Sequence, residues 1–472
     1  MQHEGRRPRV HFSGIGGTGM VAGARLAVEA GWEVRGSDTP LYPPTSEMVA
    51  ALRAPVTYAY DAANLDWSPD VVVAGNALSR GNPEVECALE RRMRMMSLPE
   101  WLKEHVLRPR RPIVISGTHG KTTTTALTAF VLDRCGLAPG FFIGGQPLDY
   151  EHSARLGAPG APFVIEGDEY DSAFFDKRAK FLHYLPEVAV ATSVEFDHGD
   201  IYAHLAEIET AFQRMLRQVP RSGWLIACAD NHAASLLPHA FSRTATYGFT
   251  EGATWRGELA PAAQGRPHVR VYREGVFWAD IEPSLKGRHN QQNALAAVAV
   301  AGILGAAPEA VADALRTFRG VRRRMEVFLE AAGITYLDDF AHHPTAIRET
   351  IAAARDFWPD RRVRVLFEPR SNTTVTKRFQ QDMLDAFSGA HQVWLGPVYR
   401  VERIPEEERL DRDALAASLG KRGVPCRAAN SVAEIVAEVR GTEQRGDVVL
   451  ILSNGAFGGI YRQFQESHAA SV

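Results

Sequence analysis

The segment Gly117-Thr118-His119-Gly120-Lys121-Thr122 has the residue types that bind a triphosphate. It lies between a short apolar run, PIVIS, and a helix-like run. In such a loop, backbone N–H groups face phosphate at a helix N-terminus, a lysine neutralises the β- and γ-phosphates, and a threonine hydroxyl ligates Mg²⁺. Ile115 stands where the standard motif has its first glycine, so the loop is a shortened variant. A chance G-K-T-T is disfavoured because strand, loop and helix agree. We predict that the loop and Thr123 bind ATP with Mg²⁺.

A second glycine-rich segment, Gly14 to Gly19, matches G-x-G-x-x-G between a strand-like and a helix-like run. Asp38 ends the next strand-like run, about 20 residues further on, as a ribose-binding acid would. Taken alone, the pattern indicates NAD, but any nucleotide diphosphate satisfies the same backbone geometry. The alternative is a turn that only packs helix on strand. The candidate ligands here are Gly16, Gly17, Thr18, Gly19 and Asp38.

Two acidic clusters follow strand-like runs in the middle of the chain. One is Glu166-Gly167-Asp168-Glu169-Tyr170-Asp171 and the other is Glu195-Phe196-Asp197-His198. Because the carboxyl ends of parallel strands meet at one edge of a sheet, both clusters should reach the edge that carries the phosphate loop. Oxygen ligands suit Mg²⁺, and an imidazole is an acceptable additional ligand. We predict a metal site from Thr122, Glu166 and His198, although any single acid could instead be solvated or cap a helix.

Two further polar groups have weaker signals. His289, Asn290 and Asn293 lie at the start of an Ala-rich helix that we predict from Asn293 to about Ala306, where they could bind a nucleobase or simply cap the helix. Asp338, His342 and His343 follow a strand, but adjacent histidines point in different directions, so the pair is a weak metal signal. Ordinary surface histidines are the alternative.

The pattern of apolar residues predicts an α/β protein of three domains. Strands alternate with helices from Arg9 onward, and the prolines and charges of 108–112 mark a first boundary. We predict a Rossmann-like domain at 1–108, a P-loop ATPase-like domain with a mainly parallel sheet at 109–320, and a Rossmann-like domain at 321–472. The second domain includes a predicted strand over VAVATSV, residues 188–194.

Composition narrows the class of protein further. Hydrophobic residues make up 45% and charged residues 23%, which is globular composition, and no apolar run is long enough to span a bilayer. The net charge of -3 gives no basic footprint for nucleic acid. Four widely spaced cysteines indicate neither a zinc site nor a disulfide scaffold. We therefore expect a cytoplasmic protein that binds neither nucleic acid nor membrane.

Together, these motifs resemble the Mur ligases of peptidoglycan synthesis. The family's patterns G-x-G-G-x-G-M, G-T-H-G-K-T-T-T, E-A-D-E-x-D, D-H, G-x-H-N-x-x-N-A-L-A and D-D-x-x-H-H-P-T are echoed in order along nearly the whole chain. The stretches AGNALSRGNPEVE, PFVIEGDEYDSAFFDKRAKFLHY, VEFDHGDIY, FEPRSN and LSNGAFGGI resemble the branch of the family that recycles a cell-wall tripeptide. The insertion after Tyr170 is the most telling.

The resemblance implies an ATP-dependent, amide-forming ligase. It would join the carboxylate of UDP-N-acetylmuramate to the amine of L-alanyl-γ-D-glutamyl-meso-diaminopimelate through an acyl phosphate. L-Alanine as acceptor is the first alternative, and a nicotinamide dehydrogenase or a nucleotide-gated switch is the second. The implied oligomeric state is a monomer or weak homodimer.

The resemblance also assigns roles to individual residues. It implies catalytic roles for Lys121, His198, Arg323, His342 and His343, nucleotide contacts from Arg323 and Asp338, and substrate contacts from Asn76, Ser79, Arg370 and Asn454. Several family members have a carbamylated lysine after the D-H motif, but this chain reads ETAFQRMLRQV there, so a second metal would be held otherwise.

Overall fold

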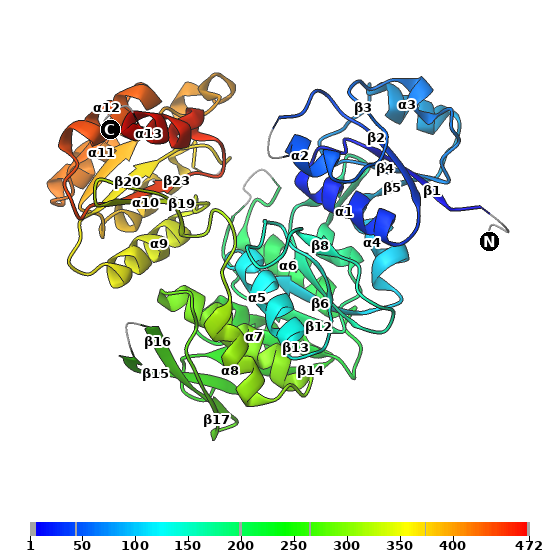
Figure 1. Ribbon diagram of the computed structural model, residues 1–472, viewed down its shortest axis with the longest axis horizontal. Coiled ribbons are helices and arrows are strands. Elements are labelled where there is room, and N and C mark those ends of the chain that lie inside the picture. Colours follow the sequence, from blue (N-terminus) through cyan, green and yellow to red (C-terminus); the bar gives the residue numbers. More distant parts are fainter. Residues whose placement is uncertain (1–5, 43–44, 198–200, 264–265, 373, 470–472) are drawn as a thin grey trace. The chain divides into compact units, whose positions relative to one another are not determined.

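A computed structural model describes residues 6–42, 45–197, 201–263, 266–372 and 374–469. The chain divides into two compact units, of which the first comprises residues 1–195, 204–284 and 292–319, and the second comprises 196–203, 285–291 and 320–472. Parallel sheets with helices occur in both units, which confirms the α/β class (Figure 1).

The first sheet, at the N-terminus, has five parallel strands in the order β3-β2-β1-β4-β5. The strand order reverses at β1: β2 and β3 lie on one side of it, and β4 and β5 lie on the other. In such sheets a ligand binds outside the carboxyl ends of the strands at the point of reversal. The glycine loop at 14–19 follows β1, so the sheet places it there. The elements are β1 Arg9–Ser13, α1 Thr18–Glu29, β2 Glu33–Ser37, α2 Thr45–Ala50, β3 Val56–Thr57, β4 Val71–Ala74, α3 Pro83–Glu90, β5 Met95–Ser97 and α4 Leu98–Leu102.

The central sheet has ten strands in the order β17-β16-β15-β14-β13-β12-β6-β9-β7-β8. Its middle strands are parallel, and β6 lies between β12 and β9, which is again a point of reversal. Helices α5 and α8 contact each other on this sheet (Figure 1). The elements are β6 Arg111–Ser116, α5 Lys121–Arg134, β7 Gly140–Phe142, β8 Ala154–Arg155, β9 Pro162–Gly167, β12 Val188–Ala191, α6 Leu205–Leu216, β13 Trp224–Cys228, β14 Arg243–Gly248, β15 Trp255–Ala263, β16 Arg266–Arg273, β17 Val276–Ile281, α7 Arg288–Ile303 and α8 Pro308–Thr317.

Three local expectations for this region were wrong or incomplete. Strand β12 ends at Ala191 instead of continuing to residue 194, because the Thr192 hydroxyl donates to the His119 carbonyl and Ser193 bonds the phosphate loop through its carbonyl and its hydroxyl. Helix α7 begins at Arg288, five positions before the predicted start. The antiparallel strands β15 to β17 and the hairpin of β10 (Asp171–Ala173) with β11 (Asp176–Ala179) were not predicted.

The third sheet lies in the second unit and has the order β18-β19-β23-β20-β21-β22. All its pairings are parallel except that of β18 with β19. Alternate residues of a strand face opposite sides, so Tyr336 and Leu337 enter two different apolar cores. The elements are β18 Glu326–Ala331, β19 Ile334–Asp339, α9 Pro344–Phe357, β20 Val363–Phe367, α10 Gln380–Ala386, β21 Gln392–Leu395, α11 Arg412–Lys421, β22 Cys426–Ala428, α12 Val432–Thr442, β23 Val448–Leu452 and α13 Ile460–Ala469.

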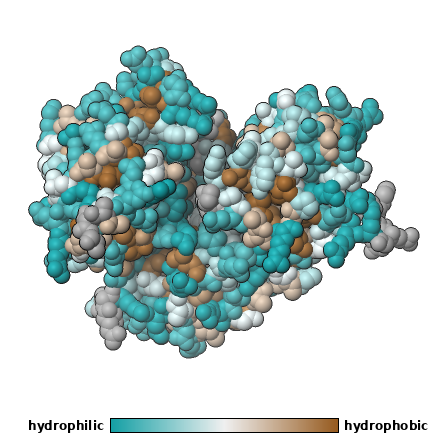
Figure 2. Space-filling view, turned by 45° about the horizontal axis from the view of Figure 1, so that its top comes forward, coloured by the Kyte–Doolittle hydropathy of each residue, from teal (hydrophilic) through white to brown (hydrophobic). Residues whose placement is uncertain are grey.

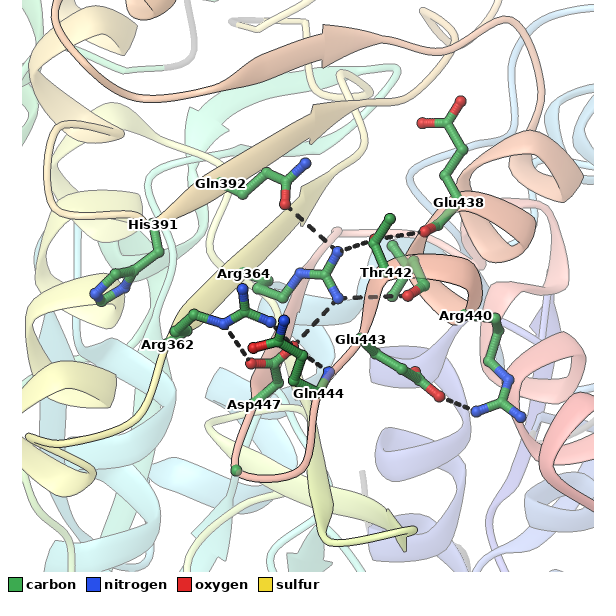
Figure 3. Close-up of polar contacts among 12 residues, drawn as sticks. Arg362, Arg364, His391, Gln392, Glu438, Arg440, Thr442, Glu443, Gln444 and Asp447 are labelled. Carbon is green, nitrogen blue, oxygen red and sulfur yellow. Dashed lines mark hydrogen bonds and ion pairs between the residues drawn. The ribbon is translucent and has the colours of Figure 1, made fainter.

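A buried polar network, which we name the Asp447 cluster, lies at the amino ends of β20 and β23 (Figure 3). Asp447 precedes β23 and is 1% exposed, and Arg364, in β20, is equally buried. The Asp447 carboxylate accepts from Arg362 at 2.8 Å and from Arg364 at 3.3 Å. The remaining members are Thr442 and Gln392, which accept from Arg364, and Gln444, whose backbone N–H donates to Asp447.

The face of the molecule in Figure 2 is mainly polar. On the face drawn in Figure 2, hydrophilic residues predominate and apolar residues gather only in separate patches. Among the described residues, no helix is long and apolar enough to cross a membrane.

Candidate functional site

The phosphate-binding loop takes its shape from two glycines and one neighbouring helix. Gly120 is the N-terminal cap of α5 and has φ +79°, a region that costs other residues strain. A β-carbon at this position would lie 2.7 Å from the Asn293 side-chain oxygen, so α7 approaches the loop closely. Asn293 Oδ1 also accepts from the Thr124 hydroxyl at 3.0 Å. The predicted strand, loop and helix are thus confirmed, and Asn293 lies against the loop.

The segment after β12 holds the outer side of this loop. The Thr118 backbone N–H donates to the Ser193 carbonyl at 3.0 Å, and the His119 backbone N–H donates to the Ser193 hydroxyl at 2.8 Å. Thr118 Oγ1 accepts from the Glu195 backbone N–H at 2.8 Å. These bonds explain why β12 ends early, because the residues that follow Ala191 bond to the phosphate loop.

Lys121 lies at the first turn of α5 and faces a carboxylate. Its Nζ lies 3.0 and 2.9 Å from the two oxygens of Glu169, whose residue is 2% exposed. Burial would lower the pKa of Lys121, but Glu169, followed by Asp168, raises it above its ordinary value. The amine is therefore charged, and it is held beside the loop where phosphate would bind.

Thr122 and Glu166 provide adjacent oxygen atoms. The Thr122 hydroxyl donates to Glu166 Oε1 at 2.9 Å, and Glu166 Oε2 accepts from the Gly144 backbone N–H at 2.8 Å. Burial raises the pKa of Glu166, and Lys121 only partly offsets this. A hard divalent cation would compensate a buried carboxylate, and hydroxyl and carboxylate oxygens are its preferred ligands. The residues present therefore fit Mg²⁺.

The third predicted metal ligand, His198, lies outside the described residues. Near it in sequence, Glu195 Oε2 is 3.3 Å from His119 Nε2, so the first residue of the second acidic cluster reaches the phosphate loop. This placement at the carboxyl ends of β6, β9 and β12 agrees with the expectation for parallel strands.

The first glycine loop is built around Asp38. Gly16 donates its backbone N–H to Asp38 Oδ2 at 2.7 Å, and the Tyr60 hydroxyl donates to Oδ1 at 3.1 Å. A β-carbon on Gly16 would meet the Leu41 side chain at 2.2 Å and Asp38 Oδ2 at 2.9 Å, so the site favours glycine. Gly17 is the N-terminal cap of α1, and Thr18 and Gly19 form its first turn.

Two other predicted substrate contacts follow β4. The Asn76 side chain donates to Asp171 Oδ1, in hairpin strand β10, at 2.9 Å. Ser79 lies in the same turn and is exposed, with its hydroxyl 3.4 Å from the Arg80 carbonyl.

The other two predicted site residues of α7, His289 and Asn290, lie in the second unit. Asn290 donates to the Lys286 carbonyl at 2.9 Å. Burial, followed by the charge of Arg324, lowers the pKa of His289 to about 4, so the ring is neutral near pH 7. Within the described part of the chain, His289 Nδ1 is a buried atom with no hydrogen-bond partner. A neutral imidazole suits hydrogen bonding rather than charge pairing.

Arg323 and Asp338 form a fixed pair at the carboxyl end of the third sheet. Arg323 Nε donates to Asp338 Oδ2 at 3.0 Å, and its Nη2 donates to the carbonyls of Ser453 and Gly455 at 2.7 and 2.9 Å. Asn454 lies between these two carbonyl groups in sequence, and its Oδ1 is buried without a partner among the described residues.

His342 and His343 lie in the loop between β19 and α9, and Arg370 follows β20 in the same unit. His343 Nδ1 accepts from the Thr345 backbone N–H and so caps α9, and its Nε2 lies 3.3 Å from the Phe196 carbonyl oxygen. His342 Nδ1 lies 2.9 Å from the Phe340 carbonyl oxygen. The Arg370 guanidinium lies over the Tyr399 ring at 3.7 Å.

The sequence patterns missed two residues that shape these loops. Tyr60 reaches Asp38 from a segment with no motif, and Ser193 lies where a strand was expected. Glu169 belonged to a predicted acidic cluster, but its role as the partner of Lys121 depends on how β9 lies beside α5, which spacing alone does not reveal.

The fold and the site together define a class of enzyme. A lysine and a threonine at a helix N-terminus, each bonded to a carboxylate, are the residue types that a nucleoside triphosphate site requires. Three family models match the chain in sequence order: "Mur ligase family, catalytic domain" over residues 9–110, "Mur ligase middle domain" over 115–301, and "Mur ligase, glutamate ligase domain" over 323–455. The chain belongs to the Mur ligase family, which confirms the expectation of an ATP-dependent, amide-forming ligase.

Individual relatives are similar over nearly the whole length. The UDP-N-acetylmuramate–L-alanyl-γ-D-glutamyl-meso-2,6-diaminoheptandioate ligase of Escherichia coli K12 is 39% identical over 98% of both chains. The UDP-N-acetylmuramate–L-alanine ligase of Burkholderia multivorans is 36% identical over 96% of both. The crystal structure of a murein peptide ligase from Psychrobacter arcticus 273-4 matches with a TM-score of 0.74 and 33% identity, over 98% of this chain and 99% of that one.

Proposed function

We propose that this chain joins UDP-N-acetylmuramate to L-alanyl-γ-D-glutamyl-meso-diaminopimelate with cleavage of ATP to ADP and phosphate. The observation that carries this proposal is the likeness, over 98% of both chains, to a ligase named for that donor and that acceptor. The Lys121–Glu169 and Thr122–Glu166 pairs would supply the chemistry that such a reaction needs.

The chemical difficulty lies in the carboxylate of the donor. Its delocalised negative charge resists attack by an amine, so the carboxylate must first be activated. We propose that it attacks the γ-phosphorus of ATP, which forms an acyl phosphate and releases ADP. The uncharged amine of the acceptor then attacks the acyl carbon. The tetrahedral intermediate expels phosphate as the amide bond forms, and the amine loses a proton.

The phosphate loop and the predicted metal ligands would bind ATP and stabilise charge in the first step. The Gly117 to Thr123 loop would hold the phosphates through those backbone N–H groups that are not bonded to Ser193, with His119 and Glu195 beside them. Lys121 would neutralise charge that develops on the transferred phosphoryl group. Thr122, Glu166 and His198 would hold Mg²⁺, which when bound lowers the charge repulsion between phosphate and carboxylate.

The donor nucleotide would bind at the first sheet. Gly16, Gly17, Thr18 and Gly19 would contact the diphosphate, and Asp38, Asn76 and Ser79 would contact the sugar portions. His289, Asn290 and Asn293 would bind the ATP base or ribose, together with Arg323 and Asp338.

The third sheet would receive the acceptor. Arg370 and Asn454 would contact the peptide, and Arg323, His342 and His343 would position it and stabilise negative charge. The guanidinium of Arg370 suits the carboxylates of a glutamyl and diaminopimelyl peptide because it can bind a carboxylate through two parallel hydrogen bonds.

A direct test compares acceptors in one assay. Purified protein is incubated with ATP, Mg²⁺ and UDP-N-acetylmuramate, and phosphate release is measured with the tripeptide, with L-alanine and with no acceptor. We expect release with the tripeptide, together with an adduct of matching mass. Release with L-alanine alone would assign the chain to the L-alanine-adding branch. No release with any acceptor would contradict the ligase proposal.

The L-alanine-adding activity is the second candidate, because a ligase of that name is 36% identical over 96% of both chains. The hairpin of β10 and β11, formed by the insertion after Tyr170, favours the tripeptide branch, since its sequence is the one that resembles that branch most.

A further inference from the structure

Glu84 is a fully buried carboxylate beside the first glycine loop. It lies in the first turn of α3 and is 0% exposed. Its Oε2 accepts from the hydroxyls of Ser13 at 2.5 Å and Ser37 at 2.6 Å, and its Oε1 accepts from the Asn64 side chain at 2.6 Å. His11 Nε2 lies 3.3 Å from the same Oε2. We name these five residues the Glu84 cluster.

The register of the first sheet brings the cluster together. Ser13 and Ser37 are register partners and are the last residues of β1 and β2. Their side chains therefore share one face of the sheet at its carboxyl end, and His11, two residues before Ser13, shares that face. A single carboxylate thus binds the ends of two neighbouring strands.

The bonds that Glu84 accepts from Ser13, Ser37 and Asn64 lead to segments of the candidate donor site, and Ser13 directly precedes the glycine loop. The Ser37 carbonyl accepts from the N–H groups of Gly14 and Ile15 at 2.8 and 3.0 Å, which starts the glycine loop. Asp38, which receives the Gly16 N–H, is the next residue after Ser37.

A third bond fixes the segment that carries Tyr60. Asn64 donates both to Glu84 and to the Ala59 carbonyl, at 2.8 Å for the latter. Tyr60, between them, donates its hydroxyl to Asp38. Glu84 therefore connects three segments that converge on Asp38, without itself facing solvent.

The carboxylate remains charged in this environment. Burial alone would raise the pKa of Glu84, but hydrogen bonds from His11, Ser13, Ser37 and Asn64 lower it to about 2. A buried charge is costly unless hydrogen bonds satisfy it, so these bonds hold their donors more firmly than a neutral acceptor would.

We propose that Glu84 is a positioning residue for the donor nucleotide: it fixes the carboxyl ends of β1 and β2, and the Asn64 segment, so that the Gly14–Gly19 loop and Asp38 are shaped to receive a nucleoside diphosphate before it binds. Preorganisation of this kind lowers the cost of ordering a loop on binding. The inference deepens the proposed function, since it concerns the same UDP-sugar.

The test is Glu84→Gln in the full-length protein. An amide has one acceptor oxygen and two donor hydrogens, so it cannot accept from Asn64 and from both serines at once. Loss of a hydrogen bond to a charged group lowers affinity by about tenfold or more. We expect KM for UDP-N-acetylmuramate and Kd for UDP, titrated alone, to rise by that factor, with KM for ATP and kcat within about twofold of wild type.

Glu86→Gln is the matched control. Glu86 is on the same helix and is also charged, but its partners are the exposed Arg80 and the Gly81 backbone N–H, so both affinities should stay within about twofold. Equal affinities for UDP in wild type and Glu84→Gln would overturn the inference, as would a parallel rise in KM for ATP.

If Glu84→Gln does not fold, Ser13→Ala and Ser37→Ala are the alternatives. Each removes one hydrogen-bond donor, and the Glu84 carboxylate keeps its other donors. Each should raise Kd for UDP by about threefold to tenfold without changing KM for ATP, and no change in either variant would overturn the inference. A wild-type protein that binds UDP but forms no product would instead refute the proposed function, and the UDP titrations would still decide the role of Glu84.

Discussion

The Glu84 cluster and the Asp447 cluster are each built around one buried carboxylate. The two carboxylates accept similar hydrogen bonds but lie at opposite ends of the strands in their sheets. Glu84 is 0% and Asp447 is 1% exposed, and both accept several hydrogen bonds. Glu84 lies at the carboxyl ends of β1 and β2, whereas Asp447 lies at the amino ends of β20 and β23. In open α/β sheets only the carboxyl ends meet the ligand. The same chemistry therefore serves binding in one place and stability in the other.

The largest effect is expected at the carboxyl end of the central sheet. Lys121→Met alone would remove the cation that the buried Glu169 carboxylate faces, so Lys121→Met with Glu169→Gln is the better variant. Removal of the cation from the phosphate loop should lower kcat by about 10³-fold, as measured by phosphate release. Lys421→Met, an exposed lysine at the end of α11, should remain within about twofold of wild type. A loss below about tenfold would mean that Lys121 contacts no phosphate in the transition state.

The next effect tests the Asp447 cluster. Asp447→Asn leaves the buried Arg364 guanidinium without its charged partner, which should lower the free energy of unfolding by about 3 kcal/mol in denaturant titrations. KM for each substrate should not change. Asp385→Asn breaks an exposed pair with Arg422 in the same unit and should cost about 1 kcal/mol or less. If Asp447→Asn weakened substrate binding instead, the contrast between the two sheet ends would be wrong.

A smaller effect distinguishes two roles of glycine beside α5. Gly120 allows the close approach of α7, whereas Gly136 only relieves backbone strain. Gly120 and Gly136 both have φ +79°, but a β-carbon would meet Asn293 at Gly120 and nothing within 4 Å at Gly136. Both alanine variants should lose about 1 kcal/mol of stability. Only Gly120→Ala should also raise KM for ATP, by about tenfold, because α7 and the loop must move apart. Equal KM values for the two variants would show that α7 does not shape the ATP site.

The last effect is a dependence of stability on pH that comes from Glu84. Its pKa is about 2 when folded and near 4.5 as the ordinary value, so the unfolded chain takes up a proton first as pH falls. The stability that Glu84 contributes is therefore present above about pH 4.5 and is lost as pH falls toward 2. The difference in stability between wild type and Glu84→Gln should shrink in denaturant titrations from pH 6 to about pH 3. A difference that does not change with pH would show that the folded-state carboxylate is not held charged by its hydrogen bonds.

Much of the fold and the phosphate loop could be predicted because local patterns determine them. The runs around β1 and β6 are apolar, and each precedes a glycine loop and a helix, so Lys121, Thr122 and Asp38 were identified from spacing. The ribbon of β15 to β17 was not predicted, because it extends the sheet by antiparallel pairing that no local motif marks.

The buried clusters could not be predicted at all from spacing. Glu84 lies in the stretch NPEVE, which carries a family resemblance but no chemical motif. Its partners His11, Ser13 and Ser37 come together only through the register of β1 with β2, and Asn64 joins them from a separate segment. The early end of β12 has a similar cause, since Thr192 and Ser193 leave the strand to bind the phosphate loop. In both cases a long-range polar contact decides a local structure.

The most direct test of the ligase account follows the oxygen atoms of the donor. UDP-N-acetylmuramate labelled with ¹⁸O in its lactyl carboxylate is incubated with ATP, Mg²⁺ and the tripeptide, and the released phosphate and the adduct are analysed by mass spectrometry. An acyl phosphate transfers one carboxylate oxygen to phosphate, so we predict one ¹⁸O in each phosphate formed with the adduct. Adduct accompanied by unlabelled phosphate, or phosphate released without adduct, would contradict the account.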